Sequence, residues 1–169
     1  MVIIQGKRLT IRQMKNKDAP ALANVLSDPQ VMHFSIRGVQ DKDGIKQFIK
    51  QCKKSYSHGK LGQWTIICHQ SRQLIGVCGL MPYTIEGEEI VHINYRLAQS
   101  HWGLGYANEA IKLCVKYGFE QLKLPQIYAL IDAENRASIK AAINAGFIYH
   151  GQHDFMQHPV EVYLSLAGQ

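Results

Sequence analysis

The sequence has few of the features that mark membrane, secreted or disulfide-bonded proteins. No stretch approaches the roughly 20 apolar residues of a membrane-spanning helix, and residues 1–8 lack the long apolar core of a signal peptide. The cysteines include no CxxC pair, and most of them lie inside apolar runs: Cys52, Cys68, Cys78 and Cys114. Free thiols buried in a reducing compartment are the simplest interpretation. We therefore expect a soluble, cytoplasmic protein without a membrane partner.

Patterns typical of metal sites and of nucleic-acid binding are also missing. The histidines His150, His153 and His158 do not follow a zinc spacing and have no cysteine nearby, so we expect no metal. Lys and Arg number 19 against 13 Asp and Glu, a formal charge of +6. That excess suits either a nucleic acid or a cofactor with several phosphates. Because the basic residues are scattered and form no stripe with interleaved aromatic residues, we expect no specific nucleic-acid partner.

The chain does contain a mixture of strand and helix patterns, within a length typical of one domain. Alternating or continuous apolar runs predict strands at residues 9–12, 64–68, 74–80, 90–97, 127–131, 147–151 and 160–166. Helical spacing predicts helices capped by Asp18, by Asp41 or Asp43, a third after the loop at 98–104, and a fourth at 137–145. We expect one mixed α/β domain over residues 1–169, since the elements do not alternate strictly as in a doubly wound sheet.

One loop carries a pattern with chemical meaning, the segment that reads Trp-Gly-Leu-Gly-Tyr-Ala at residues 102–107. Gly103 and Gly105 leave the backbone bare just before an expected helix, whose first N–H groups are unpaired and carry about half a positive charge. A pyrophosphate can approach such a site closely. No Gly-Lys-Ser/Thr follows and no third glycine stands at the dinucleotide-binding offset, so the loop is neither a P-loop nor a Rossmann fingerprint. A tight turn with a glycine cap is the alternative interpretation.

The order of several short motifs is more specific than this loop alone. Tyr95-Arg96-Leu97 precedes the loop, Asn135 to Ser138 follow the next strand, and Gly146-Phe147 end the last helix. In this order they resemble the GNAT superfamily of N-acetyltransferases, and within it the ribosomal-protein alanine acetyltransferases and their relatives. The expected strand at 9–12 and the hairpin at 64–76 match the same branch, so the resemblance covers nearly the whole chain.

The resemblance implies a sheet of about seven strands that splays open in the middle, with helices on both faces. It implies that acetyl-CoA lies in the opening between strands 90–97 and 127–131. The residues that it assigns to this cofactor are Tyr95, Arg96, Leu97, Trp102, Gly103, Leu104, Gly105, Tyr106, Ala107, Asn135 and Ser138. The family's loop signature begins with Arg or Gln where this chain has Trp102. One polar contact to the phosphates is thereby lost, whereas the backbone N–H groups, which carry most of the binding, remain.

The implied reaction is direct attack by an amine on the thioester in a ternary complex, with a backbone N–H near Leu97 for the oxyanion. His92 is the first candidate for the base, because it lies on the polar face of the cofactor strand where relatives often have Glu. The alternatives are a His92 that is merely a polar strand residue, one of Glu86, Glu88 and Glu89, or a chain of waters.

The acid is harder to assign. Many members of the superfamily use a Tyr four residues before the Gly of the Gly-Phe pair, and this chain has Ala142 there. Ser138 could hydrogen-bond the CoA sulfur or cap the helix, and Asn135 could contact the pantetheine or cap the same helix. A CoA-binding module without catalytic activity is the alternative function, supported by the departures at Trp102 and Ala142.

The acceptor is left open between a protein N-terminus and a small amine. The resemblance implies an acceptor pocket built from residues 28–60, 83–88 and 153–158, with Phe34 and Tyr83 as candidate lining residues. Relatives commonly form dimers, so a homodimer is one of the states that the resemblance implies.

Overall fold

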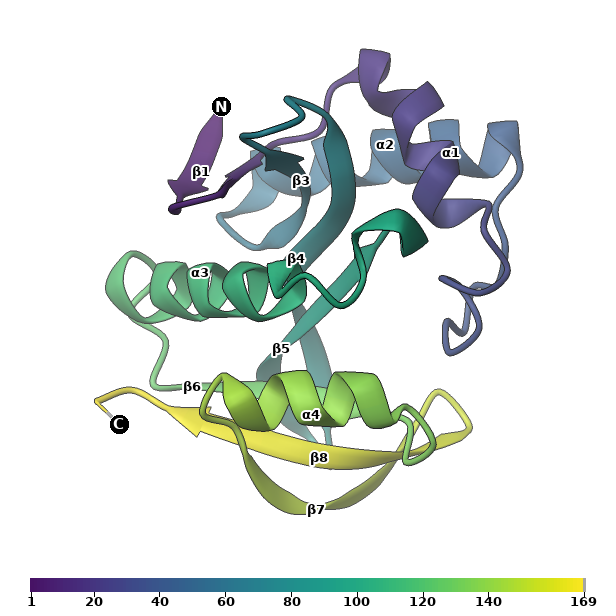
Figure 1. Cartoon of the computed structure of the whole chain (residues 1–169). Coiled ribbons are helices and arrows are strands. Elements are labelled where there is room, and N and C mark those ends of the chain that lie inside the picture. The colour runs from purple at the N-terminus through teal and green to yellow at the C-terminus, as the bar shows by residue number, and fades with distance from the viewer. Residues whose placement is uncertain (169) are drawn as a thin grey trace.

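The computed structural model describes residues 1–168, which fold around a single mixed sheet (Figure 1). Within these residues the sheet has eight strands, in the spatial order β1-β2-β3-β4-β5-β6-β8-β7. The strands are β1 (Val2–Gln5), β2 (Leu9–Arg12), β3 (Gly62–Cys68), β4 (Leu74–Ile85), β5 (Glu88–Leu97), β6 (Gln126–Ile131), β7 (Ile148–Phe155) and β8 (His158–Leu166). The helices are α1 (Ala19–Leu26), α2 (Lys42–His58), α3 (Tyr106–Glu120) and α4 (Arg136–Asn144), with short 3₁₀ turns at Asn16–Asp18 and Gln99–His101.

Two hydrophobic clusters cover opposite faces of the sheet. Helices α1 and α2 pack on one face through residues such as Leu22 and Phe48, whereas α3 packs on the other through Ile111 and Cys114. β4 contributes to both clusters. Val77 belongs to the cluster under α1 and α2, and Cys78 and Leu80 belong to the cluster under α3. Helix α4 lies on the same side as α3, against β6 (Figure 1). None of the helices among residues 1–168 is long and apolar enough to cross a bilayer.

The sheet opens between β5 and β6, its one parallel pair of strands. They pair in register at two positions, His92 with Tyr128 and Ile93 with Ala129. Beyond Ile93, β5 pairs with β4 on its other side, while β6 continues to pair with β8. Figure 1 shows the result as two parts of the sheet that diverge, with β1 to β5 above and β6 to β8 below. The expected splayed sheet is therefore present.

The structure differs from the sequence-based expectation in several elements. β1 was not predicted, because its residues, Val-Ile-Ile-Gln, do not alternate between apolar and polar and none of them is buried. β4 was expected to end at Leu80 but continues to Ile85 through Pro82. It tolerates this proline because β3 pairs with β4 only as far as Leu80, so Pro82 lies where β4 is an edge on that side.

The helix caps resolve two further expectations. Asp41, rather than Asp43, caps α2, with its Oδ1 accepting a hydrogen bond from Gly44 N at 2.7 Å. Asp18 precedes α1 but makes no capping hydrogen bond to it. Its carboxylate instead accepts two hydrogen bonds from the Arg12 guanidinium, both at 2.8 Å, and one from Lys15 N at 2.7 Å. Asp18 thus holds the predicted N-cap position of α1, but its side chain does not cap the helix, because Arg12 on β2 and the backbone of Lys15 take the same oxygens.

Candidate active site

The loop before α3 has the conformation that its glycines allow. Gly103 and Gly105 have φ of +71° and +79°, a region that residues with a Cβ rarely adopt. Gly105 is the N-cap of α3, and the backbone N–H groups of residues 103–107 make no hydrogen bond within residues 1–168. These donors, together with the positive end of α3, form a binding site for an anion.

Trp102 has a structural task in this loop. Its Nε1 donates a hydrogen bond to the carbonyl oxygen of Leu97 at 2.9 Å, which closes the turn between β5 and α3. The indole N–H is therefore already hydrogen-bonded within the protein and is not available to a ligand. The loop loses the polar side chain that the resemblance places here and gains a rigid connection to the end of β5.

A residue that the sequence did not single out braces the same loop. Arg8 donates from Nη1 to the carbonyl oxygen of Leu104 at 2.8 Å and from Nε to Glu109 Oε2 at 2.7 Å, and its guanidinium lies 4.5 Å from the centre of the Tyr106 ring. Arg8 N also donates to Glu109 Oε1 at 2.8 Å. Burial works against the Glu109 carboxylate, but these hydrogen bonds hold its pKa below the ordinary value. No local pattern connects residues 101 positions apart.

Two cavities meet at the opening of the sheet. The loop cavity, of about 760 Å³, lies beside residues 102–107. Its walls include most of the residues that the sequence assigned to a cofactor: Tyr95, Arg96, Leu97, Trp102, Gly103, Gly105, Tyr106, Ala107, Asn135 and Ser138. Leu104 does not line this cavity. Its side chain is exposed, and its carbonyl oxygen accepts a hydrogen bond from Arg8. The sheet cavity, of about 470 Å³, shares Tyr95, Arg96, Asn135 and Ser138 with the loop cavity.

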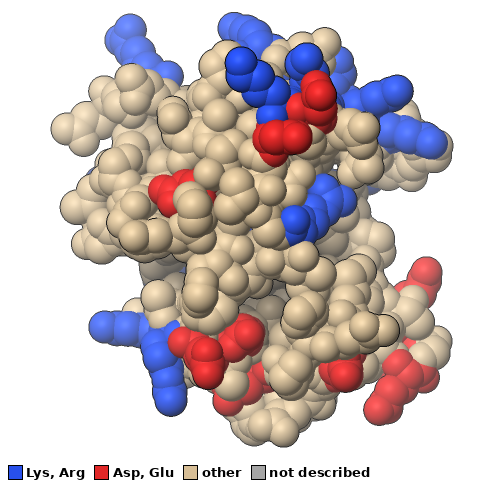
Figure 2. Space-filling view, turned by 90° about the vertical axis from the view of Figure 1, so that its right-hand side faces the viewer, with Lys and Arg blue, Asp and Glu red and all other residues tan. Residues whose placement is uncertain are grey.

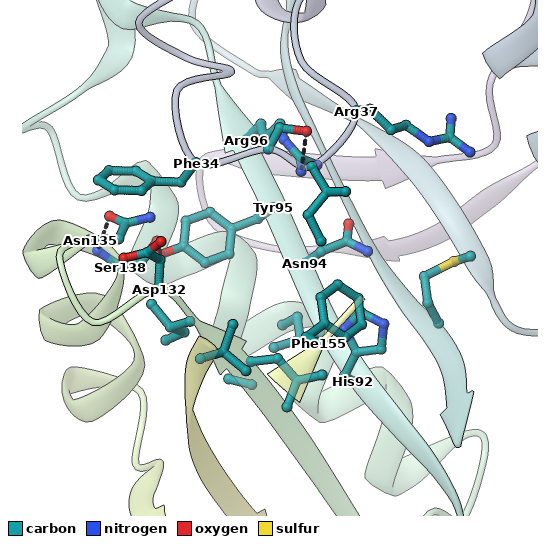
Figure 3. Close-up of a pocket in the computed structure, with 18 of the residues that line it drawn as sticks. Phe34, Arg37, His92, Asn94, Tyr95, Arg96, Asp132, Asn135, Ser138 and Phe155 are labelled. Carbon is teal, nitrogen blue, oxygen red and sulfur yellow. Dashed lines mark hydrogen bonds between the residues drawn. The ribbon is translucent and has the colours of Figure 1, made fainter. Parts of the chain in front are cut away.

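The shared wall contains a pair of hydroxyl groups. Tyr95 Oη donates a hydrogen bond to Ser138 Oγ at 2.9 Å, from β5 to the first turn of α4 (Figure 3). Burial raises the pKa of Tyr95, although the bond to Ser138 opposes the shift. The phenol is thus protonated at neutral pH and is a donor. Ala142, one turn further along α4, also lines the sheet cavity, so the Tyr95 hydroxyl shares a wall with the position at which the resemblance implies a tyrosine.

The side chain of Asn135 caps α4, whereas the hydroxyl of Ser138 is bound by Tyr95. Asn135 is the N-cap of α4, with its Oδ1 accepting a hydrogen bond from Ser138 N at 3.2 Å. The capping interpretation of Asn135 is therefore what the geometry shows, and its side chain lines both cavities as well. Ser138 does not cap the helix with its side chain. Its Oγ faces the shared wall and accepts from Tyr95.

His92 lies on the wall of the sheet cavity within a group of aromatic rings. Its ring centre is 6.2 Å from that of Tyr83 and 5.6 Å from that of Phe155, and Phe34 also lines this cavity. Burial lowers the pKa of His92 to about 4, so the ring is neutral at physiological pH. The carboxylates Glu86, Glu88 and Glu89 are exposed at the turn between β4 and β5 and do not line either cavity.

The sheet cavity also has polar groups that sequence reasoning did not find. Asn94 and Gln63 line it, and each has a buried side-chain oxygen without a hydrogen-bond partner among the described residues. They lie on either side of Gly79, which pairs with Asn94 on β5 and with Gln63 on β3. A Cβ at Gly79 would lie 2.3 Å from the carbonyl oxygen of Gly62, so β3 and β4 pack closely here.

Comparison with known proteins decides the family. The sequence profile of the acetyltransferase (GNAT) domain family matches residues 8–148, which contain the loop, the opening of the sheet and α4. The chain belongs to the GNAT acetyltransferase family. The uncharacterized N-acetyltransferase p20 of Bacillus licheniformis is 32% identical over 152 residues, covering 89% of this chain and 85% of the relative. Relatives of this kind identify the chain as an acetyltransferase, and the GNAT family uses acetyl-CoA.

Solved structures of GNAT proteins have the same fold. A GNAT acetyltransferase from Bacillus anthracis has a TM-score of 0.85 and 26% identity, with 98% of each chain covered. RimL, a ribosomal L7/L12 α-N-protein acetyltransferase solved with coenzyme A, has a TM-score of 0.83 and 17% identity, with 99% of this chain and 98% of that chain covered. The mixed α/β fold expected from the sequence is confirmed, with eight strands where about seven were expected.

Proposed function

We propose that this GNAT enzyme transfers the acetyl group of acetyl-CoA directly to a primary amine, either a small amine or a protein N-terminus, in a ternary complex. The observation that carries the proposal is the meeting of the two cavities at the opening of the sheet. Tyr95 and Ser138 lie on the wall common to both cavities. A cofactor in the loop cavity and an amine in the sheet cavity would therefore meet at these residues, and no covalent enzyme intermediate is needed.

The residues of the loop cavity fit acetyl-CoA. The unpaired N–H groups of residues 103–107 suit a pyrophosphate, and the glycines let it approach the backbone. Beyond Ile93, β5 has no strand partner on the side of β6, so its backbone can pair with the amides of a pantetheine chain. Acetyl-CoA supplies the activated acetyl group. The protein's part is to hold it, to exclude water and to move protons.

The proposed reaction forms one bond and breaks one. The amine nitrogen attacks the thioester carbon, a C–N bond forms, and a backbone N–H near Leu97 stabilises the oxyanion. The C–S bond then breaks, Ser138 gives its proton to the leaving thiolate, and Tyr95 gives its proton to Ser138. Solvent returns a proton to the Tyr95 phenolate, which balances the amine proton released on the other side of the reaction. This relay uses the hydrogen bond that the structure contains, with Tyr95 on β5 in place of a tyrosine at Ala142.

The proton of the amine leaves through the sheet cavity. His92 is neutral and lines this cavity, so it can accept a proton. A base with a pKa near 4 does not hold a proton taken from a free alkylammonium. His92 would therefore act on the tetrahedral intermediate, whose protonated nitrogen is much more acidic, and pass the proton to solvent.

The experiment is a thiol-release assay with acetyl-CoA and a panel of amines, together with calorimetric binding of acetyl-CoA. We expect thiol release with at least one amine, and slower release by His92→Ala and Ser138→Ala. His58→Ala, at the exposed end of α2, is the matched control. Tight binding of acetyl-CoA without turnover, unchanged in these variants, would instead identify a binding module without catalysis. Sedimentation of the same samples tests the homodimer that the family resemblance implies.

A further inference from the structure

Arg96 is a partly buried cation that forms no ion pair with an acidic side chain among residues 1–168. It lies on the face of β5 opposite to Tyr95 and lines both cavities. Its guanidinium donates to the neutral hydroxyl of Ser35 at 3.2 Å, and this is its one side-chain hydrogen bond within residues 1–168 (Figure 3). The salt bridges in this part of the chain are Arg8–Glu109, Arg12–Asp18 and Lys46–Asp43, and none of them includes Arg96.

A second cation lies on the same side of the sheet cavity. Arg37, in the segment between α1 and α2, lines the cavity, donates to Gln51 Oε1 at 3.2 Å and lies 5.8 Å from the centre of the Phe48 ring. Burial lowers the pKa of Arg96, and the nearby charge of Arg37 lowers it further. The two guanidinium groups therefore repel each other, and neither forms an ion pair with a carboxylate among residues 1–168.

The other titratable groups on this cavity do not neutralise the two arginines. Asp132, at the end of β6, is the one carboxylate among the described residues of the wall, and its Oδ1 accepts from Glu134 N at 2.8 Å. Figure 3 shows Asp132 beside Ser138, across β5 from Arg37. The remaining titratable wall groups are the histidines His33, His92 and His158 and the tyrosines Tyr83 and Tyr95. On this face of the molecule, Lys and Arg gather in the upper part and most Asp and Glu lie lower (Figure 2).

A partly buried guanidinium that lacks an anion is unfavourable, because the N–H donors that are shielded from water have no acceptor in its place. The cost falls when an oxyanion enters, since carboxylates and phosphates accept two parallel hydrogen bonds from one guanidinium. The site that such an anion would occupy adjoins the reacting centre, because Arg96 is next to Tyr95 in β5 and shares its strand face with Asn94 and His92.

We propose that the acceptor is a small amine that also carries an oxyanion, a carboxylate or a phosphate, which Arg96 binds with the help of Arg37. An amino acid is the simplest molecule of this kind. Its anionic end would pair with the arginines while its nitrogen faces the thioester near Tyr95 and Ser138. This inference rests on the proposed acetyl transfer to an amine and names the acceptor class. Cationic acceptors such as polyamines would be disfavoured by the same two charges.

The test compares acceptors in matched pairs by thiol release. Each amino acid in a series with increasing distance between amine and carboxylate is compared with its carboxamide. To hold the acidity of the amine nearly constant, one pair is glutamic acid α-amide against glutamine α-amide. Aminoalkyl phosphates form the phosphate arm, dipeptides with an N-terminal Asp or Glu form the peptide arm, and spermidine is the cationic control. Carboxylate or phosphate amines should give kcat/KM about 10- to 100-fold above their neutral partners.

Enzyme variants then assign the preference to its residues. Arg96→Gln should raise KM for the anionic amine about 10- to 100-fold, with a much smaller effect on its neutral partner. Arg37→Gln should have the same direction and a smaller size, and Arg96→Lys should restore part of the preference. Arg72→Gln, in the exposed turn between β3 and β4, is the control. Thermal melts and acetyl-CoA binding report whether each variant folds.

The outcomes separate this inference from the proposed function. Equal or better rates with neutral or cationic amines would overturn the anionic acceptor while acetyl transfer stands. A uniform loss for every amine in Arg96→Gln, despite unchanged acetyl-CoA binding, would also overturn it, since the residue would then serve the fold or the cofactor. If only the dipeptides with an N-terminal Asp or Glu were acetylated faster than neutral amines, the small-amine acceptor would be overturned in favour of a peptide N-terminus. No thiol release with any amine would overturn the proposed function and the acceptor class together.

Discussion

The hydroxyl of Tyr95 donates to Ser138 Oγ across 2.9 Å, and this bond joins β5 to α4 at the wall that the two cavities share. If the pair delivers the proton to the CoA sulfur, Tyr95→Phe and Ser138→Ala should each lower kcat about 10- to 100-fold. KM for acetyl-CoA should change little. The double variant should lose no more than the worse single variant, because both residues serve one relay. Additive losses in steady-state kinetics would show that the two hydroxyls act separately.

The ion pair between Arg8 and Glu109 should affect both stability and cofactor binding. Glu109→Gln leaves the Leu104 carbonyl and the loop less firmly held, so we expect a loss of about 1 kcal/mol in unfolding free energy and weaker acetyl-CoA binding. The pKa of Glu109 is lowered in the folded protein. Its contribution is thus complete above the unfolded pKa and is lost as pH falls through the folded pKa. In denaturant melts, the unfolding free energies of the wild-type protein and Glu109→Gln should differ at neutral pH and become equal at acidic pH. A difference that stays constant with pH would contradict this assignment.

Local patterns in the sequence predicted the parts of the site that depend on local geometry. The alternation of residues 90–97 placed His92 and Arg96 on one face of β5, and the glycines at 103 and 105 predicted a bare loop before a helix. These features follow from the period of a strand and from the φ values that glycine allows. The opening of the sheet was expected from the family resemblance and not from any local signal.

The contacts that complete the site were beyond such reasoning, because they depend on how distant segments pack. Arg8 meets Glu109 across 101 positions, and Tyr95 meets Ser138 across 43. The unpaired state of Arg96 is similarly non-local, since it depends on which side chains the segment between α1 and α2 brings to the cavity. Asp18 shows the converse case: its position as the N-cap of α1 was predicted, but its side chain binds Arg12 on β2 instead of the helix.

His92 predicts a loss of stability in mildly acidic solution. Burial lowers its pKa to about 4, so between about pH 6.5 and pH 4 the unfolded chain binds a proton that the folded chain does not. The unfolding free energy therefore falls as pH falls through this window, by up to roughly 3 kcal/mol if burial is retained. His92→Gln should show a flatter profile in denaturant titrations across this range. Parallel profiles for the two proteins would mean that His92 is solvated in solution and titrates normally.

The glycines of the loop give a prediction that separates strain from packing. Gly103 has φ of +71° and nothing within 4 Å of the place where a Cβ would lie, so Gly103→Ala adds backbone strain of about 1 kcal/mol without a clash. The loop should relieve that strain by shifting, and the N–H groups of residues 103–107 would then diverge from the positions that hold a pyrophosphate. Gly59→Ala is the matched control, because Gly59 has φ of 165° and open space around it. Calorimetry should show weaker acetyl-CoA binding in Gly103→Ala and unchanged binding in Gly59→Ala. Equal affinity in the two variants would show that the N–H groups of this loop do not hold the phosphates.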